Sequence, residues 1–191
     1  MSVIQAIQRG IDLGAMLFHS GYRDDDHQLA WLWCLAALAP DGIAVECGVY
    51  KGGSLVVWAD ARKGRGPIVA VDNWQGYGPE LREAFQANVD GIEVELLEMA
   101  SWEAAGLLGE VAFCFIDAGH DEDRFPHDLR AWPDRIKPGG ILAFHDYGTF
   151  PVDIGNPNVV VKEYVDEWQA KAQWVPLGRI GSLIAFRRPT E

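Results

Sequence analysis

The chain has 191 residues, of which 49% are hydrophobic, and this length and composition suit one compact domain with a full core. Its net charge of -12 and pI near 4.7 argue against broad binding to nucleic acid or anionic membranes, which both favour clustered lysine and arginine. Three cysteines without a CxxC pair disfavour a disulfide scaffold, and the longest apolar run, residues 30–39, is too short to span a bilayer. We therefore expect a soluble cytoplasmic protein that binds neither nucleic acid nor membranes.

The first forty residues predict two helices. Aspartates at 24–26 can cap the second helix, which runs through Leu38 and stops at Pro40. We interpret residues 1–40 as a helical cap whose apolar surface could also form a homodimer face. The first helix ends near Gly21 and is indicated by apolar residues at helical spacing: Ile4, Ile7, Ile11, Leu13 and Leu17.

After residue 40, strands alternate with helices. The apolar runs show no polar face, which is typical of a parallel sheet covered by helices on both sides. The predicted strands are Ile43–Val45, Ile68–Val71, Val94–Leu97, Ala112–Ile116 and Ile141–Phe144. The predicted helices between and after them are Ser54–Arg62, Pro79–Val89, Ser101–Leu107 and Glu122–Ile136.

The last part of the chain departs from this alternation. A helix near Val159–Lys171 precedes two strand-like runs, Trp174–Leu177 and Ser182–Phe186, joined by the glycine-containing turn at 178–181. These runs predict a closing antiparallel hairpin. The expected fold is therefore α/β, with a Rossmann-like seven-stranded sheet of five parallel strands and a C-terminal antiparallel hairpin, in one domain over residues 1–191 with its core at 41–191.

The segment from Glu46 to Ser54 predicts a ligand-binding turn between the first strand and its helix. Gly48 allows close approach of a ligand to the backbone, and Gly52 keeps the helix start free of side chains. The loop lacks the Gly-x-Gly-x-x-Gly spacing of dinucleotide sites, which disfavours a nicotinamide oxidoreductase. The carboxylate of Glu46 would repel a pyrophosphate but attract a cationic ligand such as S-adenosylmethionine. A strand–turn–helix without any ligand is the alternative interpretation of this segment.

Polar residues follow the other predicted strands, and the carboxyl ends of parallel strands meet at one edge of a sheet. An acid after the second strand can accept hydrogen bonds from ribose hydroxyls, although most such residues are caps or turn residues. Ser101 could bind an adenine edge and Trp102 could stack on it, but Ser101 is equally suited to be a helix cap. The residues at these ends are Asp72, Asn73 and Trp74, then Ser101 and Trp102, then Asp117, and finally His145 and Asp146.

Several of these motifs resemble class I S-adenosylmethionine-dependent methyltransferases. Residues 46–54 are similar to the cofactor loop of catechol O-methyltransferase-like enzymes, including Tyr50 and Ser54. Phe115-Ile116-Asp117 with His120, and Lys137-Pro138-Gly139-Gly140 before His145-Asp146, resemble the metal-dependent small-molecule O-methyltransferases. Residues 71–76 resemble the methyltransferases of antibiotic and sugar biosynthesis, and the similarity covers roughly residues 40–147.

The resemblance implies a role for each matching residue. At the cofactor, Asp72 would hold the ribose hydroxyls, and Asn73 and Trp74 would lie beside it. Asp117, His145 and Asp146 would bind a divalent cation, with Mg²⁺ or Mn²⁺ expected first. The methionine part of S-adenosylmethionine would contact Glu46, Gly48, Tyr50, Gly52 and Ser54, whereas the adenine would lie against Ser101 and Trp102.

Two residues depart from the pattern of these relatives. His145 stands in the metal-binding pair where they carry a carboxylate or carboxamide, and imidazole shifts preference towards Mn²⁺, Fe²⁺ or Zn²⁺. His120 stands where they carry a lysine base, and it could accept the proton of a substrate hydroxyl while Asp117 joins metal and cofactor. We expect methyl transfer to a hydroxyl of a small molecule. A metal-independent methyltransferase with His120 as base and a non-catalytic S-adenosylmethionine-binding protein are the alternatives.

Overall fold

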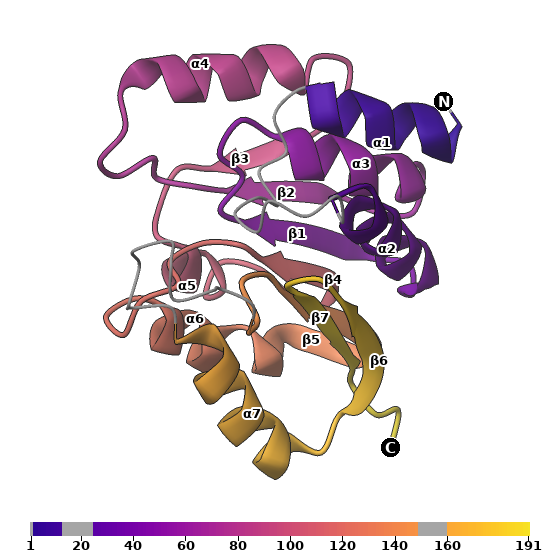
Figure 1. Ribbon diagram of the computed structural model, residues 1–191, viewed down its shortest axis with the longest axis vertical. Coiled ribbons are helices and arrows are strands. Elements are labelled where there is room, and N and C mark those ends of the chain that lie inside the picture. The colour runs from indigo at the N-terminus through magenta and orange to yellow at the C-terminus, as the bar shows by residue number, and fades with distance from the viewer. Residues whose placement is uncertain (1, 13–24, 149–159) are drawn as a thin grey trace.

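The structure is a computed structural model that describes residues 2–12, 25–148 and 160–191. Within these residues the strands form one sheet with the order β3-β2-β1-β4-β5-β7-β6 (Figure 1). The first five strands pair in parallel, and β7 lies antiparallel between β5 and β6. The strands are β1 (Ile43–Cys47), β2 (Ile68–Val71), β3 (Glu95–Leu97), β4 (Val111–Ile116), β5 (Ile136–Phe144), β6 (Val175–Ile180) and β7 (Leu183–Arg187).

Helices cover both faces of this sheet (Figure 1). One face carries α2 (Asp25–Leu38), α3 (Gly53–Ala61) and α4 (Pro79–Asn88), and α1 (Val3–Asp12) packs against α2 and α3. The opposite face carries α5 (Ser101–Ala104), α6 (Phe125–Ala131) and α7 (Val161–Ala172), and the short 3₁₀ helix η1 (Pro133–Arg135) follows α6.

Alternate residues of each central strand enter two separate cores. In β4, Phe113 and Phe115 pack with α2 and α3, whereas Cys114 and Ile116 pack with α6 and α7. All six residues of β4 are buried. This burial on both faces explains why the strand has an uninterrupted apolar sequence.

The predicted seven-stranded sheet is confirmed, but several element ends differ from their predicted positions. The helix expected over residues 122–136 is α6 followed by η1, because Pro133 has no N–H with which to continue the hydrogen bonds of the helix. The helix expected over residues 101–107 ends at Ala104. The predicted first helix continued to Gly21, and its part from residue 13 onward lies outside the described residues.

The strand order reverses between β1 and β4. The chain moves outward from β1 to β2 and β3, and then crosses back to place β4 on the other side of β1. In an open parallel sheet, ligands bind beyond the carboxyl ends of the strands at such a reversal. Among the described helices, none is long and apolar enough to cross a membrane.

Candidate active site

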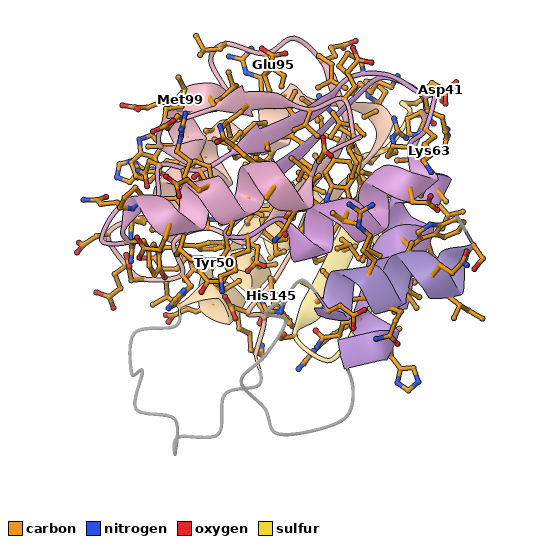
Figure 2. All side chains as sticks on the ribbon, turned by 90° about the horizontal axis from the view of Figure 1, so that it is seen from above. Asp41, Tyr50, Lys63, Glu95, Met99 and His145 are labelled. Carbon is orange, nitrogen blue, oxygen red and sulfur yellow. The ribbon has the colours of Figure 1, made fainter. Side chains whose placement is uncertain are left out.

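The loop after β1 is pressed against the end of β4. Gly48 has a φ of 85°, and a Cβ atom placed there would lie 2.2 Å from the backbone oxygen of Asp117. Its N–H donates to the Val71 carbonyl oxygen of β2 at 2.8 Å. Gly48 is therefore the residue that lets three strand ends converge. Figure 2 shows Tyr50 and His145 on this side of the molecule, away from Asp41 and Lys63.

The side chain of Glu46 points into the core behind this loop. It is fully buried, and its two carboxyl oxygens accept hydrogen bonds from the Ser54 hydroxyl and the Trp58 indole N–H. Burial raises the pKa of the Glu46 carboxyl to about 8, although both hydrogen bonds act in the opposite direction. Glu46 and Ser54 thus join the end of β1 to the start of α3.

A cavity lies between the ends of β1, β2 and β4. The expected cofactor residues that line it are Gly48, Tyr50, Asp72, Asn73, Ser101, Trp102 and Asp117, and His120 lines it as well. The other four expected residues, Glu46, Gly52, Ser54 and Trp74, are not among the described residues that line it. A second cavity, of about 620 Å³, lies around Arg9, Lys63 and Glu93 and contains none of the expected site residues.

Asp72 ties together the loops that follow β1 and β2. Its carboxylate accepts the backbone N–H groups of Tyr50 at 2.9 Å and Trp74 at 2.8 Å. Burial raises the pKa of Asp72, while these backbone hydrogen bonds lower it. The Trp74 indole N–H donates to the Tyr50 carbonyl oxygen at 2.9 Å, and its ring packs on Phe85. Both Tyr50 and Trp74 have positive φ angles, of 47° and 44°, a backbone conformation that is costly outside glycine.

At the next strand end, the Ser101 hydroxyl donates to the carboxylate of Asp128, a fully buried residue of α6. Burial raises the pKa of Asp128 to about 7, and the Ser101 hydrogen bond lowers it. Trp102 stacks obliquely on His127, with 5.2 Å between the ring centroids. The two residues expected at an adenine ring are thus held by consecutive residues of α6.

Two carboxylates and an imidazole meet at the ends of β4 and β5. His145 Nδ1 lies 3.0 Å from Asp117 Oδ1 and 3.2 Å from Asp146 Oδ1, and one ligand atom from each of the three residues falls within 4.8 Å of the others. Although burial favours the neutral ring, the two carboxylates raise the pKa of His145 to about 10. Asp146 has a φ of 59°, so the backbone is strained where this group is built.

The other ring nitrogen of His145 is fixed from outside the parallel strands. Its Nε2 lies 2.9 Å from the Ser182 hydroxyl oxygen at the start of β7, and that hydroxyl donates to Gln28 Oε1 of α2 at 3.1 Å. Because the Ser182 proton is directed at Gln28, the Ser182 oxygen accepts a hydrogen bond from Nε2–H. Nδ1 is the ring nitrogen that faces the two carboxylates.

His120 lies at the boundary between this group and the cavity. Its Nδ1 is 3.9 Å from Asp146 Oδ2, and its side chain is 35% exposed. The ring is therefore close to the acidic group and accessible from solvent. The structure brings together the expected base and the three expected metal ligands at one edge of the sheet.

A family model described as a methyltransferase domain matches residues 45–147 of this sequence. The chain belongs to the methyltransferase-domain family. Its matched region runs from the middle of β1 to the residue after Asp146, and so contains the cavity and the acidic group described above.

Solved methyltransferases share the fold of this one. The O-methyltransferase TomG from Streptomyces achromogenes, solved with S-adenosylmethionine, is 17% identical with a TM-score of 0.61, over 97% of this chain and 89% of that one. PaMTH1 from Podospora anserina, solved with S-adenosylhomocysteine, is 19% identical with a TM-score of 0.61, over 99% and 88%. An rRNA methylase from Streptococcus thermophilus is 16% identical with a TM-score of 0.58, over 90% and 99%. The fold is that of class I S-adenosylmethionine-dependent methyltransferases.

Some residues that line the methyltransferase cavity are not among the expected site residues, although one of them, Gln75, lies in the segment 71–76 that resembles other methyltransferases. Gln75, Tyr77 and Arg124 line the cavity, and Arg124 is paired with Asp121. Tyr77 contacts Tyr50 edge-on, at 5.8 Å between the ring centroids. Gln28 and Ser182 support His145, and Asp128 supports Ser101, from outside the cavity lining, and no motif in the sequence indicates these contacts.

Proposed function

We propose that this methyltransferase transfers a methyl group from S-adenosylmethionine to a hydroxyl of a small molecule with the help of a divalent cation. The observation that carries the proposal is the convergence of Asp117, His145 and Asp146 beside the cavity that Gly48 and Asp72 line. The donor and the acceptor oxygen must lie close together for an in-line methyl transfer. A cation site next to a cofactor cavity supports that arrangement.

The three side chains fit a divalent cation by their chemistry. Two carboxylates and an imidazole suit Mn²⁺, Fe²⁺ or Zn²⁺ at least as well as Mg²⁺. The contact between His145 Nε2 and Ser182 leaves Nδ1 on the side of Asp117 and Asp146. A metal-bound histidine usually has its other nitrogen held by such a partner. A cation bound there would lower the pKa of a coordinated hydroxyl.

The cofactor would lie along the cavity. Asp72 would accept the ribose hydroxyls through lone pairs that its bonds to Tyr50 and Trp74 do not use. Gly48 would let the methionine part approach the backbone, and Ser101 and Trp102 would border the adenine. Glu46, Gly52, Ser54 and Trp74 would then support the cavity walls, a less direct role than the sequence suggested.

His120 would serve as the base in this reaction. Its imidazole lies beside Asp146 and faces the cavity, so it can take the proton of a hydroxyl held there and release it to solvent. We further propose that the enzyme has no nucleic-acid or membrane partners, on the basis of its net charge of -12, and that it is cytoplasmic, on the basis of its three cysteines without a CxxC pair. We also propose a homodimer through its N-terminal helices.

A metal-independent methyltransferase is the second candidate, and one observation favours it. The ion pairs of His145 with Asp117 and Asp146 already compensate one of the two carboxylate charges without a metal ion. In that case His145 would be a structural cation and His120 alone would activate the oxygen.

One experiment separates the two candidates. Calorimetric titration with Mn²⁺ should show binding that Asp146→Ala abolishes, while the affinity for S-adenosylhomocysteine changes by less than about threefold. Turnover of a panel of hydroxylated acceptors should stop with EDTA and return with Mn²⁺. Turnover that EDTA does not affect would refute the metal assignment, and cofactor binding without turnover of any acceptor would favour a non-catalytic binding protein.

A further inference from the structure

The direction of the Ser101 hydroxyl bears on which purine base the cofactor cavity prefers. Ser101 lines the cavity, yet its proton is donated to Asp128 in the protein interior. A serine hydroxyl has one proton and two lone pairs. Because the Ser101 proton is donated to Asp128, the Ser101 oxygen can accept a hydrogen bond from a molecule in the cavity but cannot donate one to it.

We propose that the Asp128 carboxylate fixes the direction of the Ser101 hydroxyl, so that the cavity selects a purine with an amino group rather than an oxo group at position 6. Asp128 is a positioning residue here, because it acts through Ser101. A 6-amino group donates to the Ser101 oxygen, whereas a 6-oxo group brings a second acceptor against it. The inference rests on the proposed placement of adenine beside Ser101.

The surroundings of Asp128 allow this direction to reverse near neutral pH. Its carboxyl is fully buried, and burial raises its pKa to about 7. When protonated, it can donate to the Ser101 oxygen and free the Ser101 proton for the cavity. Among the described residues, the titratable group that we find interacting with it is Cys47 of β1, whose thiol contacts Cys114 of β4 and whose pKa burial raises well above its ordinary value. His127 precedes Asp128 on α6 but is exposed, with its ring against Trp102.

The sign of the pH dependence follows from these states. Above about pH 7 the ionised carboxylate accepts from Ser101, and the 6-amino preference is present. As the pH falls through this value, the neutral acid donates instead and the preference weakens. A residue that served only to hold α5 on α6 would change the affinity for both purines by the same factor.

Calorimetric titration with S-adenosylhomocysteine and with S-inosylhomocysteine, its 6-oxo counterpart, tests the inference. At about pH 8 the wild-type protein should bind the 6-amino ligand at least about tenfold more tightly, since a buried acceptor that faces another acceptor loses its hydrogen bond. Asp128→Asn, whose amide can donate to Ser101, and Ser101→Ala should both reduce this ratio to about threefold or less. Lowering the pH to about 6 should reduce the ratio in the wild type but not in these two variants.

Asp134→Asn is the matched control, because it makes the same charge change at an exposed residue of η1 and should keep the wild-type ratio. Thermal unfolding reports whether Asp128→Asn is folded, and Ser101→Ala provides the test if it is not. If either variant kept the wild-type affinity ratio, the inferred selectivity would be refuted, whereas the proposed cofactor cavity would stand. If folded wild-type protein bound neither ligand, the proposed cofactor cavity would fail as well.

Discussion

Replacing Glu46 by glutamine tests whether this buried side chain is uncharged in the folded methyltransferase. In the structure both Glu46 oxygens accept hydrogen bonds, from the Ser54 hydroxyl and the Trp58 indole. A neutral carboxyl group can instead donate to the Ser54 oxygen while it still accepts from Trp58, and a glutamine side chain can do the same. The variant should therefore keep both contacts. It removes the ionisation while preserving shape and hydrogen bonding.

The magnitude follows from the two pKa values of Glu46. An unfolded chain loses this proton near pH 4.5, whereas the folded protein keeps it until about pH 8. Because the folded state binds more protons in this interval, its free energy of unfolding falls as the pH rises. At about 1.36 kcal/mol per pH unit, the interval corresponds to a loss of at most about 5 kcal/mol that the glutamine variant does not suffer.

Urea unfolding at about pH 5 and about pH 8 measures this difference, because all other groups titrate alike in both proteins. The stability of Glu46→Gln relative to the wild type should rise by several kcal/mol between the two values. A relative stability that stayed constant within about 1 kcal/mol would refute the reasoning and show that the carboxylate is ionised throughout. The affinity for S-adenosylhomocysteine should change by less than about threefold, since Glu46 does not line the cavity.

Two further predictions concern the support of the site. Ser182→Ala should weaken Mn²⁺ binding by about 10-fold to 100-fold in calorimetry, because the Ser182 hydroxyl holds His145 Nε2. An unchanged affinity for Mn²⁺ would mean that His145 is not a ligand. Gly48→Ala should lower the free energy of unfolding by at least about 2 kcal/mol more than Gly91→Ala, because both glycines have positive φ but only the Cβ at 48 meets a backbone oxygen. Equal costs in urea unfolding would show that the loop can move away from Asp117.

The sequence was sufficient for the sheet but only partly for the site. Apolar runs that are buried on both faces identify parallel strands, and the residues after each run necessarily meet at one edge. The direction in which a side chain points at that edge cannot be predicted from the apolar runs. Glu46 precedes the loop and belongs to the strand, where its side chain turns towards Trp58 instead of the cavity. The pairing of Ser101 with Asp128 depends on how α5 and α6 pack, which no local pattern encodes.

Contacts between residues far apart in the sequence could not be predicted either. Gln28 and Ser182 are 154 residues apart, and only the completed sheet brings them to His145. The boundary between a helical cap at residues 1–40 and a core at 41–191 stays a prediction. Gln28 nevertheless shows that a residue of the proposed cap contributes to the hydrogen bonds of the site.

The Gln28–Ser182–His145 chain also has a consequence for the order in which the site can be assembled. Asp117, His145 and Asp146 are all synthesised before Ser182, but the partner that fixes the imidazole arrives with β7, near the C-terminal end of the sequence. During synthesis, the cavity walls from β1 to β4 can form while the imidazole is still unheld. A nascent chain would therefore form its cavity walls before the arrangement of Asp117, His145 and Asp146 that we propose to bind a cation, and only the insertion of β7 between β5 and β6 would complete that arrangement.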